Sequence, residues 1–304
     1  MSSKLSFTTR MILLAGLAIG CLTALWYTFV ALKEEPVPRD EIVASYAYRA
    51  PADIGMSVNE IGEGLFEFSY RSFDGAQVNG RISYPPAKQE KYPVLVGVAA
   101  MGRGYQRWWV DSFKGRPTVT RVNEITERAS AKGYVVVAID ARFHGTRKDP
   151  NRTLGSIMND LHYFGDKRDY EAMIRNTVLD YRVLMDWIAQ QRDLDGGNLT
   201  LAGYSMGAQV ALLASALDPR VNRVIAMVPP HIDDKTAIVA PKNLASLIKR
   251  PKVLLITADD DEYASREDNL HLYEAIASQD KRHQVFEGGH ILPANYIAEV
   301  GSWL

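Results

Sequence analysis

The sequence predicts an α/β domain with a mostly parallel sheet, helices on both faces and an antiparallel hairpin at its start, preceded by one transmembrane helix. Three observations predict this arrangement. Short apolar runs typical of buried strands alternate with helical patterns, as in parallel βαβ units. An uncharged apolar run fills residues 11–32. A serine flanked by glycines, Ser205, lies between one of the strands and a helix.

The apolar run is long enough to cross a membrane. As a helix, 11–32 would extend about 33 Å, against about 30 Å of bilayer hydrocarbon. Lys4 and Arg10 precede the run, and Trp26 and Tyr27 lie near its end. The positive-inside bias therefore predicts a cytoplasmic N-terminus over 1–10, a signal-anchor over 11–32 and a catalytic domain in the periplasm or outside the cell.

Two alternative interpretations of this run place the domain on the same side. A cleavable signal peptide has a shorter apolar core, of about 7 to 15 residues, that ends in small residues, whereas this run ends in Tyr27-Thr28-Phe29-Val30-Ala31-Leu32. A lipid anchor on Cys21 has partial support from the preceding Ala18-Ile19-Gly20, although the chain stays apolar beyond it. Cys21 is the single cysteine, which excludes a disulfide framework and a cysteine zinc site.

Beyond the run, 33–59 is polar and contains prolines, so we expect a tether without a packed core. Residues 60–304 have the length of one α/β domain. A net charge of −1 with interspersed charges gives no basic stripe, which argues against nucleic-acid binding. We find no metal-ligand motif and no phosphate loop, and so expect neither a cofactor nor a metal.

The elements of this domain follow in order. A hairpin is expected over 65–84. Buried strands are expected at 94–98, 135–139, 198–202, 221–228, 251–257 and 283–286. The clearest helices are those over 120–132, 168–191 and 208–214.

The turn between the third of these strands and its helix is the candidate nucleophile elbow, Gly203-Tyr204-Ser205-Met206-Gly207. G-x-S-x-G in this context gives a turn so tight that side chains at the glycine positions would collide with neighbouring backbone. Ser205 would be the nucleophile, and the Met206 amide, at the helix N-terminus, would donate to an oxyanion. By itself the pentapeptide also fits an ordinary structural turn.

A serine nucleophile needs a base and an acid, which in this chain order follow the serine. His290 lies in a glycine loop, Glu287-Gly288-Gly289-His290, just past a strand, and is the candidate base. The preceding strand ends in Asp259-Asp260-Asp261, from which one carboxylate would orient the imidazole.

At these residues the chain resembles the α/β-hydrolase superfamily, in its esterase and dienelactone-hydrolase-like or acyl-aminoacyl-peptidase-like branch, over about 60–304. Further matching motifs are Ser72-Phe73-Asp74-Gly75, the strand that leads into Ala99-Ala100-Met101-Gly102, and Asp140-Ala141-Arg142-Phe143-His144-Gly145. The resemblance selects Asp261 as the acid, with Asp260 as the alternative, because the usual His-Gly before it is replaced by Thr257-Ala258. It implies an oxyanion donor at Met101, although Ala99-Ala100 stands where the family usually has His-Gly.

Loops at the same edge of the sheet supply the candidate substrate contacts. Arg103, Trp108 and Trp109 follow the oxyanion loop and would form an aromatic wall with a cation, unless the tryptophans pack on the core edge. His144 would also contact substrate, whereas Arg142 is expected to brace neighbouring loops.

We therefore expect a serine hydrolase that cleaves small-molecule carboxylic esters through an acyl-enzyme. The alternatives are a serine peptidase of the prolyl-oligopeptidase-like type, although too few residues precede Leu65 for a propeller, and a non-catalytic binding protein on the same fold. Dienelactone hydrolases use a cysteine nucleophile, so that specific activity is not expected.

Overall fold

A central sheet of nine strands organises the domain. A computed structural model describes residues 6–304. The strand order is β1-β2-β3-β7-β4-β8-β9-β10-β11. The strands are β1 Ser57–Gly62, β2 Leu65–Arg71, β3 Gln77–Ser83, β4 Tyr92–Val98, β7 Val135–Ile139, β8 Leu194–Tyr204, β9 Val221–Met227, β10 Lys252–Ala258 and β11 Lys281–Phe286, and a two-stranded ribbon follows β4 (β5 Ser112–Phe113, β6 Arg116–Pro117).

The type of strand pairing changes once across this sheet, at β7. β1, β2, β3 and β7 pair antiparallel in turn, and every pairing from β7 to β11 is parallel. The predicted hairpin and the mostly parallel sheet are therefore confirmed. Parallel strands end at a common edge, and that edge is where chemistry-bearing loops meet.

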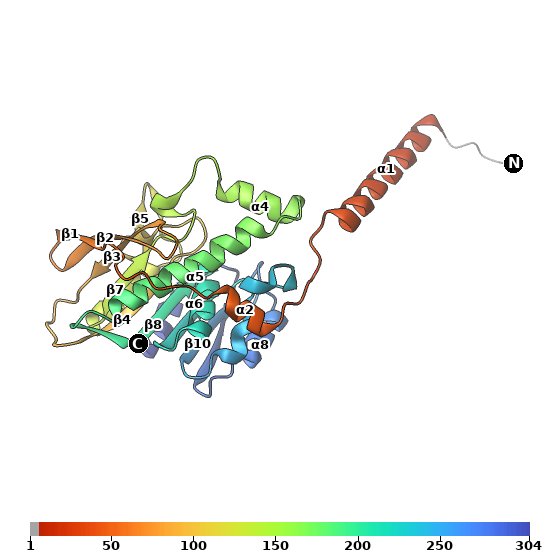
Figure 1. The fold of residues 1–304 in the computed structure, drawn as a ribbon. Helices are drawn as coiled ribbons and strands as arrows, with labels where there is room; N and C mark the ends of the chain where they lie inside the picture. The colour runs from red at the N-terminus through yellow and green to blue at the C-terminus, as the bar shows by residue number, and fades with distance from the viewer. Residues whose placement is uncertain (1–5) are drawn as a thin grey trace.

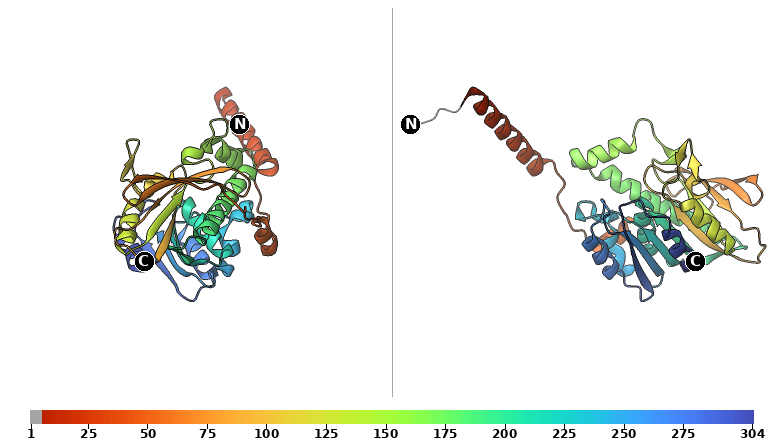
Figure 2. Two further views of the ribbon diagram at one scale, coloured as in Figure 1. Left: turned by 60° about the vertical axis from the view of Figure 1, so that its left-hand side comes forward. Right: turned by 180° about the vertical axis from the view of Figure 1, so that it is seen from behind.

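Helices cover both faces of the sheet (Figures 1 and 2). One buried cluster joins the sheet to α5 (Arg168–Ile188) and α6 (Met206–Leu217). A second lies on the opposite face, beneath α3 (Val122–Ala131) and α9 (Tyr296–Trp303). The remaining helices are α4 Leu154–Tyr163, α7 Pro241–Leu244 and α8 Arg266–Ala275.

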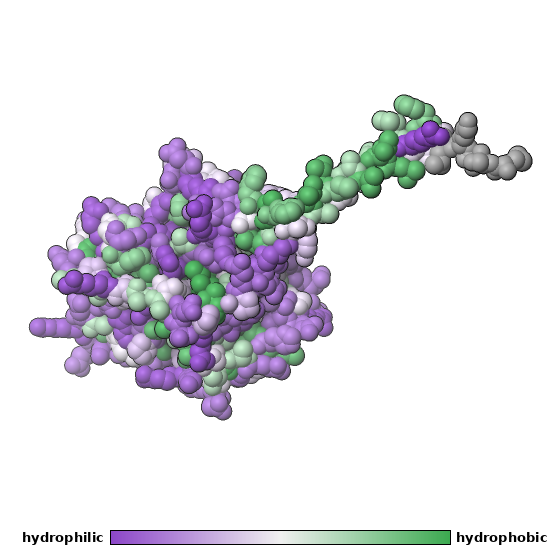
Figure 3. All heavy atoms as spheres, turned by 45° about the vertical axis from the view of Figure 1, so that its right-hand side comes forward, coloured by the Kyte–Doolittle hydropathy of each residue, from purple (hydrophilic) through white to green (hydrophobic). Residues whose placement is uncertain are grey.

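Two helices precede the domain. α1 (Phe7–Phe29) is apolar and is long enough to cross a membrane by length and composition, a test that a signal sequence also passes. It projects away from the domain and touches it only near its C-terminal end (Figures 1 and 3). Ser6 caps its N-terminus by accepting a hydrogen bond from the Thr9 amide.

The segment 33–59 is not the unpacked tether that its composition predicts. Within it, α2 (Arg39–Ser45) packs on the domain, with Ile42 and Tyr46 fully buried. The Tyr46 hydroxyl donates to the Ile238 carbonyl at 2.9 Å, and Arg182 donates to the Tyr46 carbonyl at 3.0 Å. One buried side chain on a short helix and one just beyond it give no readable periodicity, so this docking left no clear pattern in the sequence.

Candidate functional site

Ser205 occupies the sharp turn between β8 and α6. Its backbone has φ 57° and ψ −123°, a strained conformation for a residue with a side chain. A Cβ on Gly203 would lie 2.0 Å from the Gly207 carbonyl oxygen, and one on Gly207 would lie 2.2 Å from the Val98 carbonyl oxygen. Both glycines are therefore required by close backbone approach, which supports the reading of this turn as an elbow rather than an ordinary turn.

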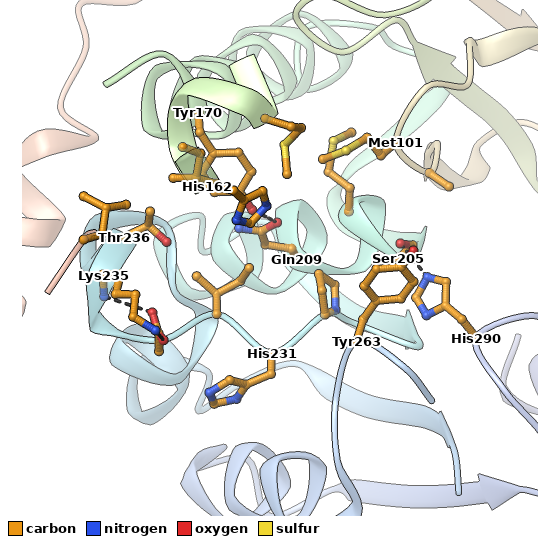
Figure 4. A pocket seen from close by; sticks show the side chains of 18 of the residues that line it. Met101, His162, Tyr170, Ser205, Gln209, His231, Lys235, Thr236, Tyr263 and His290 are labelled. Carbon is orange, nitrogen blue, oxygen red and sulfur yellow. Dashed lines mark hydrogen bonds and ion pairs between the residues drawn. The ribbon is translucent and has the colours of Figure 1, made fainter. Parts of the chain in front are cut away.

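His290 and Asp261 approach Ser205 in a hydrogen-bonded line (Figure 4 shows Ser205 and His290). His290 Nε2 lies 2.7 Å from Ser205 Oγ, and His290 Nδ1 lies 3.0 Å from each carboxylate oxygen of Asp261. The Asp261 side chain is 1% exposed and that of His290 is 13% exposed. A carboxylate in this position fixes the tautomer in which Nδ1 carries the proton and Nε2 accepts one from the serine.

The three successive aspartates after β10 have separate partners. Asp259 accepts the Gly288 amide at 2.9 Å and pairs with Arg266, so it fastens the loop that carries His290. Asp260 is exposed, and only Asp261 reaches the imidazole. Asp261 also accepts the amide of Tyr263 at 2.9 Å, which orients the carboxylate.

Two tyrosines, which the sequence reasoning did not single out, hold the imidazole loop. The Tyr204 hydroxyl donates to the His290 carbonyl at 2.8 Å and accepts the Leu292 amide at 2.9 Å. The ring of Tyr263 meets the imidazole edge-on, with centroids 4.6 Å apart. Only their positions in the sequence could have indicated this role, since Tyr204 directly precedes the serine and Tyr263 follows the acid by two residues.

Two residues whose backbone amides have no partner within residues 6–304 line the cavity beside Ser205. Met206 is the first residue of α6, where amides have no partner within the helix, and Met101 lies just past β4. Neither amide donates to another group within residues 6–304. Both residues line the same cavity as Ser205, so two residues with unpaired backbone donors share the cavity of the serine.

The cavity that contains Ser205, Met206 and His290 has a volume of about 840 Å³ and a mainly apolar lining. Its walls come from α4, from the segment after β9 and, unexpectedly, from the C-terminal end of α1. Tyr170 and Gln209 form a polar pair on one wall, 3.4 Å apart (Figure 4). Of the predicted substrate contacts, Arg103 lines this cavity.

The other three predicted substrate contacts are wrong. Trp108 is fully buried and packs face-on against Gly97 in β4, where a Cβ would lie 2.4 Å from its ring. Trp109 donates to Ser83 Oγ at 2.9 Å, on the core edge. His144 is fully buried and its Nδ1 donates to the Arg142 carbonyl at 2.6 Å; burial lowers the pKa of His144 to about 4, so it is neutral.

Arg142 acts as the expected brace. It donates to Asp74, in the turn of the β2–β3 hairpin, and to Asp180 of α5, whose side chain is fully buried. Arg147 pairs with the same Asp180 at 2.7 Å. The two family motifs around Asp74 and Arg142 thus tie the hairpin to a helix and hold the loop next to the site, without entering the cavity.

No group of three or more His, Cys, Asp or Glu side chains that could hold a metal occurs in the part of the chain that the structure describes. Cys21 is exposed on α1, outside the site.

Comparison with known proteins adds a family and a fold. The sequence model of the dienelactone hydrolase family matches residues 110–289. Acetyl xylan esterase 1 from Thermoanaerobacterium sp. JW/SL YS485 is similar at 20% identity and a TM-score of 0.67, over 89% of this chain and 96% of that chain. Acetyl xylan esterase from Paenibacillus sp. R4 is similar at 16% identity and a TM-score of 0.66, over 90% and 96%. A putative dienelactone hydrolase from Klebsiella pneumoniae is similar at 14% identity and a TM-score of 0.56, over 79% and 95%.

These likenesses establish the predicted α/β-hydrolase fold. No curated protein matches the sequence.

Proposed function

Because the chain belongs to the dienelactone hydrolase family and is a carboxylic ester hydrolase, we propose that Ser205, His290 and Asp261 are its catalytic triad. The observation that carries the proposal is the hydrogen-bonded line from Asp261 through His290 to Ser205, with spacings of 3.0 and 2.7 Å. The fit to acetyl xylan esterases supports an ester as the substrate class.

In this mechanism His290 Nε2 takes the Ser205 proton while Oγ forms a bond to the ester carbonyl carbon. The oxyanion accepts hydrogen bonds from the amides of Met206 and Met101, strengthened by the N-terminal dipole of α6. His290 then returns the proton to the leaving alkoxide, which departs as the alcohol and leaves an acyl-serine. Water, deprotonated by His290, releases the acid and restores Ser205.

Asp261 acts through the imidazole. Its carboxylate holds the proton-bearing Nδ1 and stabilises the imidazolium formed in each half-reaction. The strained backbone of Ser205 keeps Oγ clear of β8 and within reach of Nε2, so the nucleophile is positioned before substrate arrives.

We also propose that α1 is an uncleaved signal-anchor, with the catalytic domain in the periplasm or outside the cell. The support is its length, its lack of charge from Met11 onward and the absence of any buried residue in it. Intact-mass measurement of the purified membrane fraction tests this, and a mature chain that begins beyond residue 32 would contradict it.

A fluorophosphonate probe tests the nucleophile in the full-length protein. The unmodified protein is expected to label once, and Ser205→Ala to lose both the label and at least about 1,000-fold of its turnover of p-nitrophenyl acetate. Ser215→Ala is the matched control, because this buried serine lies on the same helix, away from the cavity. Undiminished labelling of Ser205→Ala would overturn the proposal.

Ester and amide substrates separate the esterase from a peptidase. A putative dipeptidyl aminopeptidase IV from Bacteroides ovatus shares the fold, but this chain covers only 34% of that protein. We expect p-nitrophenyl esters to be turned over faster than matched peptide amides, and the reverse order would favour the peptidase.

A further inference from the structure

The cavity that holds Ser205 is partly walled by α1, the helix that we propose as the membrane anchor. Trp26 and Tyr27, near the C-terminal end of α1, line it together with Ala31 and Leu32. Trp26 Nε1 donates to the Tyr163 carbonyl at the end of α4, at 2.7 Å. The nucleophile and the anchor therefore share one continuous hollow.

The contact between anchor and domain is reinforced just beyond α1. The Glu35 amide donates to the Asp234 carbonyl at 3.1 Å, and the Glu35 carboxylate pairs with Lys167 at 3.1 Å. Gly165, with φ 65°, lies so close to the Val30 carbonyl that a Cβ there would come within 1.9 Å of it. The close packing at Gly165 fits a docked anchor better than a freely swinging one.

The positions of Trp26 and Tyr27 indicate the level in the bilayer at which the cavity opens. The uncharged stretch that begins at Met11 ends at Leu32, and Lys33 is the first charge after it. Aromatic residues near the ends of transmembrane helices lie at the headgroup level. The mouth beside Trp26 therefore lies at the outer interface of the bilayer.

The rim of the cavity on this side is apolar and exposed. Tyr163 and Phe164, at the end of α4 next to α1, are 64% and 69% exposed. Three further apolar or aromatic side chains that line the cavity are also exposed: Val119 at 38%, Tyr263 at 57% and Ile291 at 59%. Such a surface is costly in water and favourable in the headgroup and acyl boundary. The apolar surface of α1 leads directly up to the domain (Figure 3).

We infer that the site takes a membrane-resident amphipathic ester, whose acyl chain enters from the outer leaflet between the end of α1 and α4. This inference rests on the proposed function, since it names the substrate class of the same triad. The acyl chain would lie along Met101, Met158 and Leu161, which line the cavity, with the ester carbonyl at Ser205. The released fatty acid returns to the leaflet and the alcohol leaves on the water side.

Two esters that share one chemistry and differ in location test the inference. The full-length protein is reconstituted into phosphatidylcholine vesicles. It is then assayed with 4-methylumbelliferyl oleate dissolved in the bilayer and with water-soluble p-nitrophenyl acetate. The test variant is Tyr163→Ser with Phe164→Ser, at two exposed side chains outside the cavity lining.

We expect this variant to hydrolyse the bilayer ester about tenfold more slowly, because the apolar rim no longer seats in the interface, and to leave p-nitrophenyl acetate turnover unchanged. The matched control is Val58→Ser with Ile61→Ser, which removes two exposed apolar side chains of β1, at the opposite end of the domain from α1 (Figure 1). The control is expected to keep both activities.

The outcomes separate the two proposals. Hydrolysis of the soluble ester without hydrolysis of the bilayer ester overturns the inference and leaves the triad standing. Equal slowing of the bilayer ester in the rim variant and the β1 control also overturns it. If neither ester is hydrolysed, the proposed function fails and the inference fails with it.

Discussion

Asp261→Asn is the sharpest test of how the proposed triad works, because it replaces one oxygen by nitrogen and changes little volume. Both carboxylate oxygens of Asp261 lie 3.0 Å from His290 Nδ1, and Oδ1 also accepts the Tyr263 amide. The asparagine oxygen is expected to keep the Tyr263 contact. Its NH₂ group then takes the position of Oδ2. The NH₂ donor faces His290 Nδ1, which also has to be a donor if Nε2 is to accept the serine proton.

The magnitude follows from the lost charge. An imidazolium and a carboxylate whose charge centres are about 4 Å apart attract by about 4 kcal/mol at an effective dielectric of 20. Losing that attraction in the transition state corresponds to roughly 10³ in kcat. The misplaced donor favours the wrong tautomer and adds to this, so we expect kcat to fall by about 10³ to 10⁴.

The assay is steady-state hydrolysis of p-nitrophenyl acetate by the full-length protein. The KM for p-nitrophenyl acetate should stay within a few-fold of the wild-type value, because Asp261 is not one of the described residues that line the cavity. Asp260→Asn is the matched control, since this exposed neighbour has no contact with the imidazole and should keep kcat within about twofold. A folded Asp261→Asn enzyme that keeps more than a tenth of kcat, or an equal loss in Asp260→Asn, would refute the assigned role.

Three further substitutions test the scaffold. Trp108→Ala should lower the free energy of unfolding by about 3–5 kcal/mol in urea titration, while the folded enzyme keeps its KM. A raised KM would show that Trp108 contacts the substrate after all. Burial depresses the folded-state pKa of His144 from 6.5 to about 4. The unfolded chain therefore binds the proton first as pH falls, and up to about 3 kcal/mol of stability, present above pH 6.5, is lost between pH 6.5 and 4. His144→Asn should flatten that slope in urea titrations across this range, and an unchanged slope would contradict the buried neutral imidazole. Gly207→Ala, whose Cβ would press on the Val98 carbonyl, should cost about 1–3 kcal/mol and lower kcat by displacing the oxyanion loop; wild-type values for both would show that the elbow can relax.

The placement of Ser205, Asp261 and His290 could be predicted because parallel strands end at one edge of the sheet. Once β8, β10 and β11 were recognised from their apolar runs, the residues after each had to lie near one another. Chain order alone does not select among three successive aspartates. That choice depends on the turn after β10, in which Asp259 binds the Gly288 amide and so directs Asp261 at the imidazole.

The errors arose where a loop packs against a distant part of the chain. Trp108 and Trp109 follow the oxyanion loop, so proximity in sequence suggested a substrate wall. The structure turns Trp108 into the core, over Gly97. A glycine inside a buried strand, one residue before its end, was a readable signal, because a missing side chain there indicates close approach of another group.

The contact of α1 with α4 had no comparable signal. An apolar helix that fits a membrane carries the same pattern whether or not its end docks on the domain, since lipid and protein both accept apolar side chains. The hydrogen bond from Trp26 to the Tyr163 carbonyl and the close approach at Gly165 distinguish a docked helix from a loose one.

Ala99-Ala100 replaces the usual His-Gly of the oxyanion loop, and the packing of that loop explains why the replacement can be tolerated. A Cβ on Gly207 would lie 2.2 Å from the Val98 carbonyl oxygen and 2.9 Å from that of Ala99. The loop therefore packs directly against the second glycine of the elbow. Since the proposed donor is the backbone amide of Met101, its position depends on that packing rather than on the side chains before it. Gly207 therefore constrains the positions of both proposed oxyanion donors. For this reason the departure at 99–100 is compatible with the proposed chemistry.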